Sequence, residues 1–67
     1  MGILNFEKIK ALRERRGLSQ EEAARLAGFS GRQRWNDIEN GYRTNVELDT
    51  LERIARALNV GAAELLK

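Results

Sequence analysis

One short segment of this sequence concentrates side chains that can form hydrogen bonds. It reads GFSGRQRWNDIENG, residues 28–41, and it places arginine, glutamine, asparagine and aspartate side chains between two glycines. Ser30 is a helix-start signal and Gly41 a helix-stop signal, so the segment is predicted to contain one short helix. Only Trp35 and Ile38 in that helix are strongly apolar. Such a helix is either a poor element or one whose outer, polar face binds a partner.

The residue types that the chain lacks exclude most catalytic and metal chemistry. Its 67 residues include no Cys and no His, so disulfides, thiolate metal sites and the commonest general base are absent. No nucleophile accompanies the carboxylates that caps, ion pairs and surface exposure explain, which are Glu21, Glu22, Asp37 and Glu39. We therefore expect no enzyme activity, no cofactor, no metal and no small-molecule substrate.

The size of the chain and its hydropathy favour one small domain. A domain of about this size buries only roughly 60% of the surface that its unfolded chain exposes, so its stability margin is expected to be thin. The start MGILNF lacks a signal-peptide pattern, and no stretch approaches the roughly 20 apolar residues that a membrane span needs. We expect a single domain over residues 1–67 that is cytoplasmic and has no membrane partner.

The basic residues are unevenly distributed. The net charge is only +2, yet residues 8–16 carry five basic side chains against one acid, Glu14. This run is typical of a solvated helix face, and it is also typical of a surface that binds an anionic partner.

Apolar spacing, caps and glycines predict an all-α fold. Phe6, Ile9 and Leu12 recur at three-residue steps, which gives a helix one apolar stripe, and Asn5 is its expected cap. Nothing in the chain alternates with period two. We expect five helices, over about residues 6–16, 20–27, 32–40, 48–58 and 62–66.

The second helix has start and stop signals of its own. Ser19 and Glu22 in SQEE match a capping box, in which each side chain bonds the backbone amide of the other residue. Gly28 supplies the left-handed residue that closes the helix. The inner face is expected to consist of Ala23, Leu26 and Ala27.

Weaker signals mark the later helices. Ser30 followed by Gln33 is a weaker capping box for the third helix, and Trp35 and Ile38 then face the core. Trp35 is interpreted as a core anchor, with stacking on a base as the alternative. In the last helix Gly61 is the expected cap. The inner face of the fourth helix is predicted to be Leu48, Leu51, Ile54, Ala55 and Leu58.

The second and third helices are separated by a short connection around Gly28, which is the signature of a helix-turn-helix. The segments GLSQEEAARLAGFS, IENG and LDTLERIARALNV follow one another in the order found in lambdoid phage repressors and Cro. The chain resembles this family, often called XRE, over about residues 6–66. It departs from the usual spacing by one extra residue before IENG, most simply Gly31.

The resemblance implies that residues 32–40 form a recognition helix that lies in the major groove of DNA. Arginine can bond both acceptors of guanine, glutamine and asparagine can pair with adenine, and aspartate can accept from cytosine. The residues that fall on or beside the outward face of this helix are therefore expected to read bases, and they are Arg32, Gln33, Asn36 and Asp37. For Asp37 the alternative is a solvated carboxylate that pairs with another side chain of the helix.

The resemblance also implies contacts to the sugar-phosphate backbone, which position a protein without reading sequence. Gln20 matches the family residue that bonds a phosphate and buttresses the recognition helix. The other expected backbone contacts are Arg34, Arg43 and Asn45. Glu39 is expected to pair with Arg13 and to be structural.

These features imply a sequence-specific regulator of transcription that binds double-stranded DNA. We expect a repressor that acts as a homodimer on a palindromic operator. The apolar residues of the last helix could form the dimer interface, or they could simply close the core; they are Val60, Ala62, Leu65 and Leu66. The alternative is an antitoxin-type protein-interaction module that also binds its own operator.

Overall fold

The computed structural model describes residues 3–42 and 46–67, and helices dominate these ranges. Four α-helices are followed by one 3-10 turn, η1: α1 (Phe6–Arg15), α2 (Gln20–Leu26), α3 (Arg32–Glu39), α4 (Leu48–Leu58) and η1 (Ala62–Leu65). The all-α prediction is confirmed. The prediction of a fifth α-helix is wrong, because the backbone turns extended at Leu66 after a single helical turn.

The expected caps of the first two helices are present. The Asn5 side chain accepts a hydrogen bond from the Lys8 amide at 3.2 Å. In the capping box of α2, the Glu22 amide donates to Ser19 Oγ at 3.0 Å, and the Ser19 amide donates to Glu22 Oε1 at 2.8 Å. Gly28 follows α2 with φ +80°, a conformation that favours glycine, so the chain can turn there toward α3.

The start of α3 differs from the expectation. The helix begins at Arg32 as predicted, but Gly31 is its cap residue and no side chain bonds the first-turn amides. The proposed box of Ser30 and Gln33 is therefore wrong. The extra residue moves Ser30 one position too far from the helix, and the Gln33 side chain bonds Asp37 instead.

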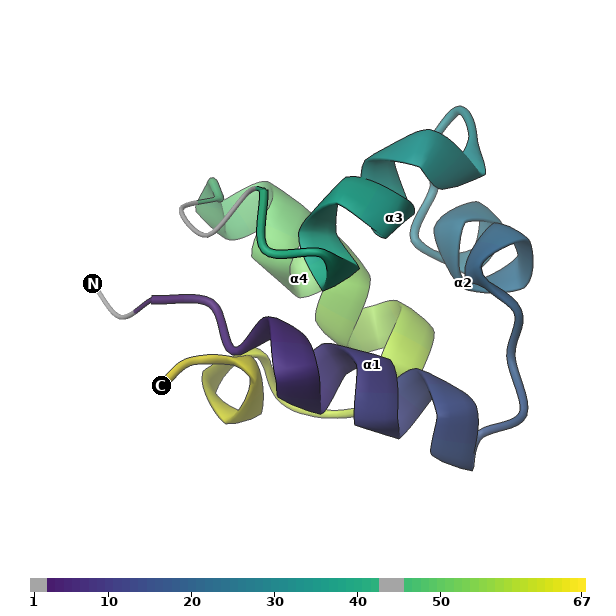
Figure 1. The fold of residues 1–67 in the computed structure, drawn as a ribbon. Coiled ribbons are helices and arrows are strands. Elements are labelled where there is room, and N and C mark those ends of the chain that lie inside the picture. Colours follow the sequence, from purple (N-terminus) through teal and green to yellow (C-terminus); the bar gives the residue numbers. More distant parts are fainter. Residues whose placement is uncertain (1–2, 43–45) are drawn as a thin grey trace.

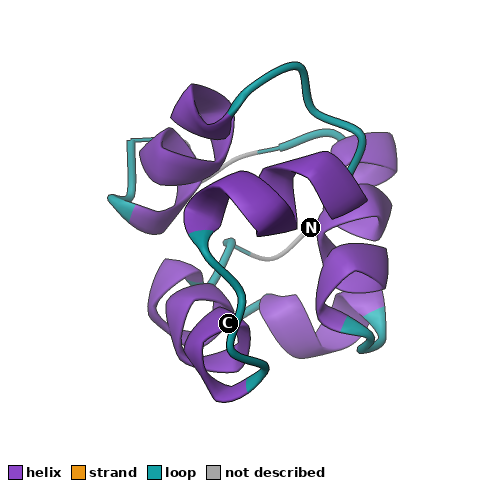
Figure 2. Cartoon of the chain, turned by 90° about the vertical axis from the view of Figure 1, so that its right-hand side faces the viewer, coloured by secondary structure: helices purple, strands orange, loops and turns teal. Residues whose placement is uncertain are grey.

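The core is built largely from Trp35 and aliphatic side chains. It lies between the helices, whose arrangement Figures 1 and 2 show. Trp35 and Ile38 are fully buried, which confirms that they face inward. The side chains below 2% exposure also include Leu4, Ile9, Ile54, Leu58 and Leu65. The tryptophan is thus the largest anchor of this core.

Two leucines that were expected in the core are exposed. Leu26 is 55% exposed, and Ala24 is buried in its place. At roughly 100° per residue, Ala23, Ala24 and Ala27 share one face of α2, and Leu26 lies about 100° away from the centre of that face. Leu48 is 60% exposed because it is the first residue of α4 and precedes the segment that packs.

The two ends of the chain are joined by backbone hydrogen bonds. Leu4 and Leu66 form an antiparallel bridge. The Asn5 amide donates to the Leu65 carbonyl at 2.7 Å, and the Lys67 amide donates to the Ile3 carbonyl at 2.8 Å. In Figure 1 the segment before α1 accordingly lies beside the C-terminal segment. No sequence pattern indicated this pairing.

Candidate nucleic-acid interface

The polar face of α3 is presented by a helix that is anchored from behind. Trp35 and Ile38 hold α3 to the core, while Arg32 and Gln33 are exposed and Asn36 and Asp37 are half-buried. Gln33, Asn36 and Asp37 lie on the arc opposite the buried side chains at roughly 100° per residue. The structure therefore brings the four predicted base-reading residues together on one short helix. Their contact with bases stays a prediction.

A buried carboxylate fixes α3 to the two preceding helices. Glu39 is 7% exposed and accepts hydrogen bonds from Arg13 Nε at 2.5 Å and Arg13 Nη2 at 3.2 Å. It also accepts from the indole of Trp35 and from Gln20 Nε2, the latter at 3.1 Å. The expected pair of Arg13 and Glu39 is therefore present. One carboxylate links α1, α2 and α3.

The electrostatics of Glu39 follow from these contacts. Burial disfavours the ionised carboxylate and would raise its pKa. The hydrogen bonds from Arg13, Trp35 and Gln20 outweigh burial and lower the pKa of Glu39 below its usual value. Glu39 is thus an ionised structural group, and no side-chain oxygen of it is left for DNA.

Gln20 lies at the first position of α2, where the resemblance implies a phosphate contact. Its side-chain nitrogen donates to Glu39, so Gln20 does buttress α3 as expected. The amide oxygen of Gln20 makes no hydrogen bond within the described ranges. Its contact with a phosphate stays a prediction.

Two predicted base-reading residues bond each other. Gln33 Nε2 donates to Asp37 Oδ1 at 2.9 Å across one turn of α3. Both residues were expected to read bases, and the alternative for Asp37 was a pair within the helix, which the structure shows. The signal for a shared role was their i,i+4 spacing, since glutamine and aspartate one turn apart form such bonds on helices.

Arg34 points toward α4 and the turn rather than along the outward face of α3. Its Nη2 donates to Thr50 Oγ1 at 3.1 Å, and its guanidinium lies 4.8 Å from the ring centroid of Phe29. Phe29 in turn contacts Trp35, with 6.2 Å between ring centroids. Arg34 therefore braces the turn. No local sequence pattern indicated this role, because Arg34 and Thr50 are 16 residues apart.

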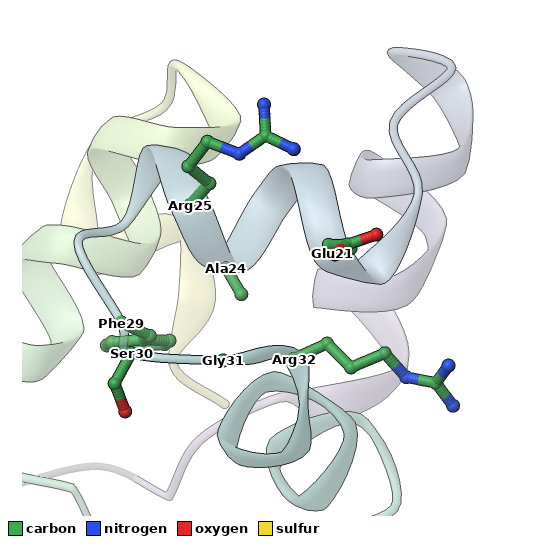
Figure 3. A pocket seen from close by; sticks show the side chains of 7 residues that line it. All are labelled: Glu21, Ala24, Arg25, Phe29, Ser30, Gly31 and Arg32. Carbon is green, nitrogen blue, oxygen red and sulfur yellow. The ribbon is translucent and has the colours of Figure 1, made fainter.

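Arg32 lies where the start of α3 faces α2. A hollow of about 150 Å³ lies between α2 and the start of α3. In Figure 3 the Arg32 side chain extends away from Phe29 and Ser30, which lie at the other end of this hollow. Arg32 also lines a neighbouring hollow with Arg13 and Gln20. A cation thus lies beside Gln20, one of the residues that were expected to touch a phosphate.

The predictions that remain concern two DNA-backbone contacts and the candidate dimer interface. Arg43 and Asn45 lie outside the described residues. Leu65 is fully buried, so it closes the core and is removed from the candidate dimer interface. The other three residues of that interface are half-buried and pack against the core: Val60, Ala62 and Leu66.

The described ranges contain no group of three or more acidic, His or Cys side chains that could hold a metal ion. None of the helices described here has the length and apolar content needed to cross a membrane.

Comparisons with known proteins identify the class. A helix-turn-helix family model matches residues 9–65. The restriction-modification controller protein C.AhdI from Aeromonas hydrophila is 36% identical, with a TM-score of 0.83 and 94% of each chain covered. SinR, a master regulator for biofilm formation solved in complex with DNA, is 30% identical with a TM-score of 0.86, over 96% of this chain and 100% of that one.

A hypothetical transcription factor from Neisseria, NHTF, is 35% identical with a TM-score of 0.81, over 92% of this chain and 69% of that one. A comparison with curated proteins gives no match. The fold and these relatives define a DNA-binding regulator of transcription, not an enzyme. The chain belongs to the XRE-type helix-turn-helix family.

Proposed function

We propose that this protein binds duplex DNA sequence-specifically by placing α3 in the major groove. The observation that carries the proposal is that α3 has one buried face, which packs on the core, and one polar face toward solvent. Trp35, Ile38 and Glu39 are buried and hold the helix. The opposite face offers the donors and acceptors of Gln33 and Asn36, and the exposed Arg32 lies beside that face at the start of the helix. Because the helix is already held in place, it can present these groups to base edges without a large loss of backbone conformational entropy on binding.

Contacts to the sugar-phosphate backbone of the DNA are proposed to fix the position of α3 in the groove. Gln20, with its free amide oxygen and its second N–H, lies beside α3 and is proposed to bond a phosphate together with the amides that begin α2. Arg43 and Asn45, which follow α3 in the sequence, are proposed to touch the sugar-phosphate backbone of the DNA. Arg34 bonds Thr50 through one of its five N–H groups, which leaves others for a phosphate at the same end of α3.

The regulator is proposed to act as a homodimer on a palindromic operator. An α3 of eight residues reads only a few base pairs, and a two-fold protein doubles the length of the site. The half-buried residues Val60, Ala62 and Leu66 are proposed to form the interface, because a partner would cover apolar surface that this chain covers only in part. Repression then follows if the dimer occupies DNA that the polymerase needs.

Selection of bound sequences from random duplex DNA tests the proposal. We expect enrichment of one inverted repeat, with each half-site read by one α3. Arg32→Ala and Asn36→Ala are expected to weaken binding to that repeat by about 1 to 3 kcal/mol and to relax preference at one base pair each. The matched control is Arg56→Ala, an exposed arginine on α4. Failure to enrich any sequence would contradict the proposal.

A further inference from the structure

The hydrogen bond between Gln33 and Asp37 constrains the side-chain amide of Gln33, a group that can pair with a base through two hydrogen bonds. Gln33 is exposed on α3, and its Nε2 lies 2.9 Å from Asp37 Oδ1. The backbone between them is regular helix, so the two side chains meet without distortion.

The chemistry of the two side chains determines which end of the glutamine faces outward. A glutamine amide has an acceptor oxygen at one end and a nitrogen with two hydrogens at the other. The two ends have nearly the same shape, so an unconstrained amide can turn over and present either end. An ionised carboxylate only accepts hydrogen bonds, and it therefore binds the nitrogen end of Gln33 alone.

One N–H of Gln33 is bonded to Asp37, and within the described ranges the other N–H and Oε1 make no hydrogen bond. Together they form a fork with one donor and one acceptor. Adenine presents the complementary pattern in the major groove, an acceptor at N7 and a donor at N6. Guanine presents two acceptors, N7 and O6. One of them would face the Oε1 of Gln33, and two acceptors cannot form a hydrogen bond.

Resting on the proposed function, we infer that Asp37 is a positioning residue, not a base reader, and that it holds the Gln33 amide in the orientation that selects adenine over guanine. The negative charge of Asp37 also lies on the face that approaches DNA, where phosphates repel it. A carboxylate at that place lowers the affinity for any DNA sequence, but it increases the preference for adenine over guanine at one base pair. This is the pattern expected of a specificity-determining residue.

The test is a comparison of four duplexes that differ only at the base pair read by Gln33. That pair is located first, as the position where Gln33→Ala loses preference. We expect the wild-type protein to favour adenine there over guanine by about 5- to 150-fold. Asp37→Asn keeps the size of the side chain but can accept or donate, so it no longer dictates the amide orientation.

Asp37→Asn is therefore expected to reduce the adenine-to-guanine ratio at the same base pair to within about two- to threefold of unity. In a Gln33→Ala background the same substitution is expected to leave the ratio unchanged, because the residue acts through Gln33. Glu52→Gln, which removes one exposed carboxylate from α4, is the control for charge alone. It is expected to change the ratio at no position.

Each other outcome overturns the inference in a recognisable way. An unchanged ratio in Asp37→Asn would show that the amide is oriented without Asp37. A change at a different base pair would show that Asp37 reads a base itself. A wild-type preference for a base other than adenine would show that the fork is not presented as argued. If the wild-type protein preferred no sequence at all, the proposed function would fail together with the inference.

Discussion

The indole nitrogen of Trp35 donates a hydrogen bond to the carboxylate of Glu39, one turn further along α3, and the same carboxylate receives Arg13 from α1. A buried indole N–H needs a partner, and here the partner is the group that already links the helices. The core anchor and the polar cluster are therefore one unit. We expect that a substitution in either part will destabilise the whole of α3.

Substitution of Trp35 should separate the two roles of its ring. Trp35→Ala removes the largest fully buried side chain, and such truncations cost about 3 to 5 kcal/mol, close to the whole stability of a small domain. Trp35→Phe keeps most of the apolar volume but removes the donor to Glu39, at a cost of about 1 to 3 kcal/mol. Urea unfolding followed by circular dichroism should show a folded Phe variant and an unfolded Ala variant. A Phe variant as stable as the wild-type protein would contradict the role of the hydrogen bond, and equal losses in both variants would contradict the role of the apolar ring.

Acid should destabilise the protein through Glu39. Its pKa is lowered in the folded state because hydrogen bonds outweigh burial. A carboxylate with a lowered folded pKa contributes stability above its unfolded pKa and loses that contribution as the pH falls through the folded value. We expect the free energy of unfolding in urea to fall steadily between about pH 5 and about pH 3.

The pKa of Glu22 is also lowered, by hydrogen bonds from the Ser19 amide and hydroxyl. Glu22→Gln removes that second carboxylate from the exposed capping box and leaves Glu39 in place. This variant should still lose stability in acid, with a shallower slope than the wild-type protein. A Glu22→Gln variant whose stability no longer depends on pH would assign the acid effect to the cap instead of the buried cluster.

Local signals predicted much of this fold, because helix caps and apolar periodicity depend on neighbours in the sequence. The capping box of Ser19 and Glu22 and the inward side of α3 at Trp35 and Ile38 were predicted in this way. The exposure of Leu26 was not, because short alanines let α2 pack closely on one face, and only the packed structure shows which face that is.

Contacts between distant segments explain most of what sequence reasoning missed. The bond from Arg34 to Thr50 joins residues 16 apart, and no local pattern predicts which arginine α4 will meet. The pairing of Leu4 with Leu66 likewise depends on where the two chain ends arrive. The pair of Arg13 and Glu39 was expected only through the family resemblance, since a buried ion pair leaves no periodic signal.

The two glycines around the turn should respond to substitution in opposite ways. Gly28 has φ +80°, so Gly28→Ala places a Cβ in the left-handed region and should cost about 1 to 2 kcal/mol. Gly31 is extended, and a Cβ there would meet no atom within 4 Å. Gly31→Ser adds a capping hydroxyl and should stabilise by a few tenths of a kcal/mol. Thermal melts of both variants provide the measurement, and a destabilised Gly31→Ser would mean that the turn needs glycine at both places.

Affinity for DNA should fall steeply with salt. The basic residues of the chain neutralise phosphates, and the counterions that they release make the logarithm of the affinity fall linearly with the logarithm of salt concentration. We expect a slope of several negative units between about 50 and 200 mM salt, measured by fluorescence anisotropy on the selected operator. Arg43→Ala should reduce the magnitude of the slope by about one and weaken selected and random DNA alike. An affinity that did not change with salt would argue against phosphate contacts.

Dimerisation should be visible in the geometry of the operator. A two-fold dimer that reads one face of the duplex places its recognition helices roughly 34 Å apart, which is one turn of DNA. Sedimentation should therefore show two protomers on each selected site. Insertion of about five base pairs between the half-sites moves them to opposite faces of the duplex, and the affinity should fall to that of a single half-site.

Substitutions in η1 provide the matched test of the interface. Ala62→Glu places a charge at the half-buried position, and Ala63→Glu places the same charge at the exposed neighbour. We expect Ala62→Glu to sediment as a monomer and to lose the benefit of the second half-site, while its affinity for one half-site is retained. Ala63→Glu should behave as the wild-type protein. Thermal melts must show that both variants are folded, and a folded Ala62→Glu that still binds two protomers per site would place the dimer contact elsewhere.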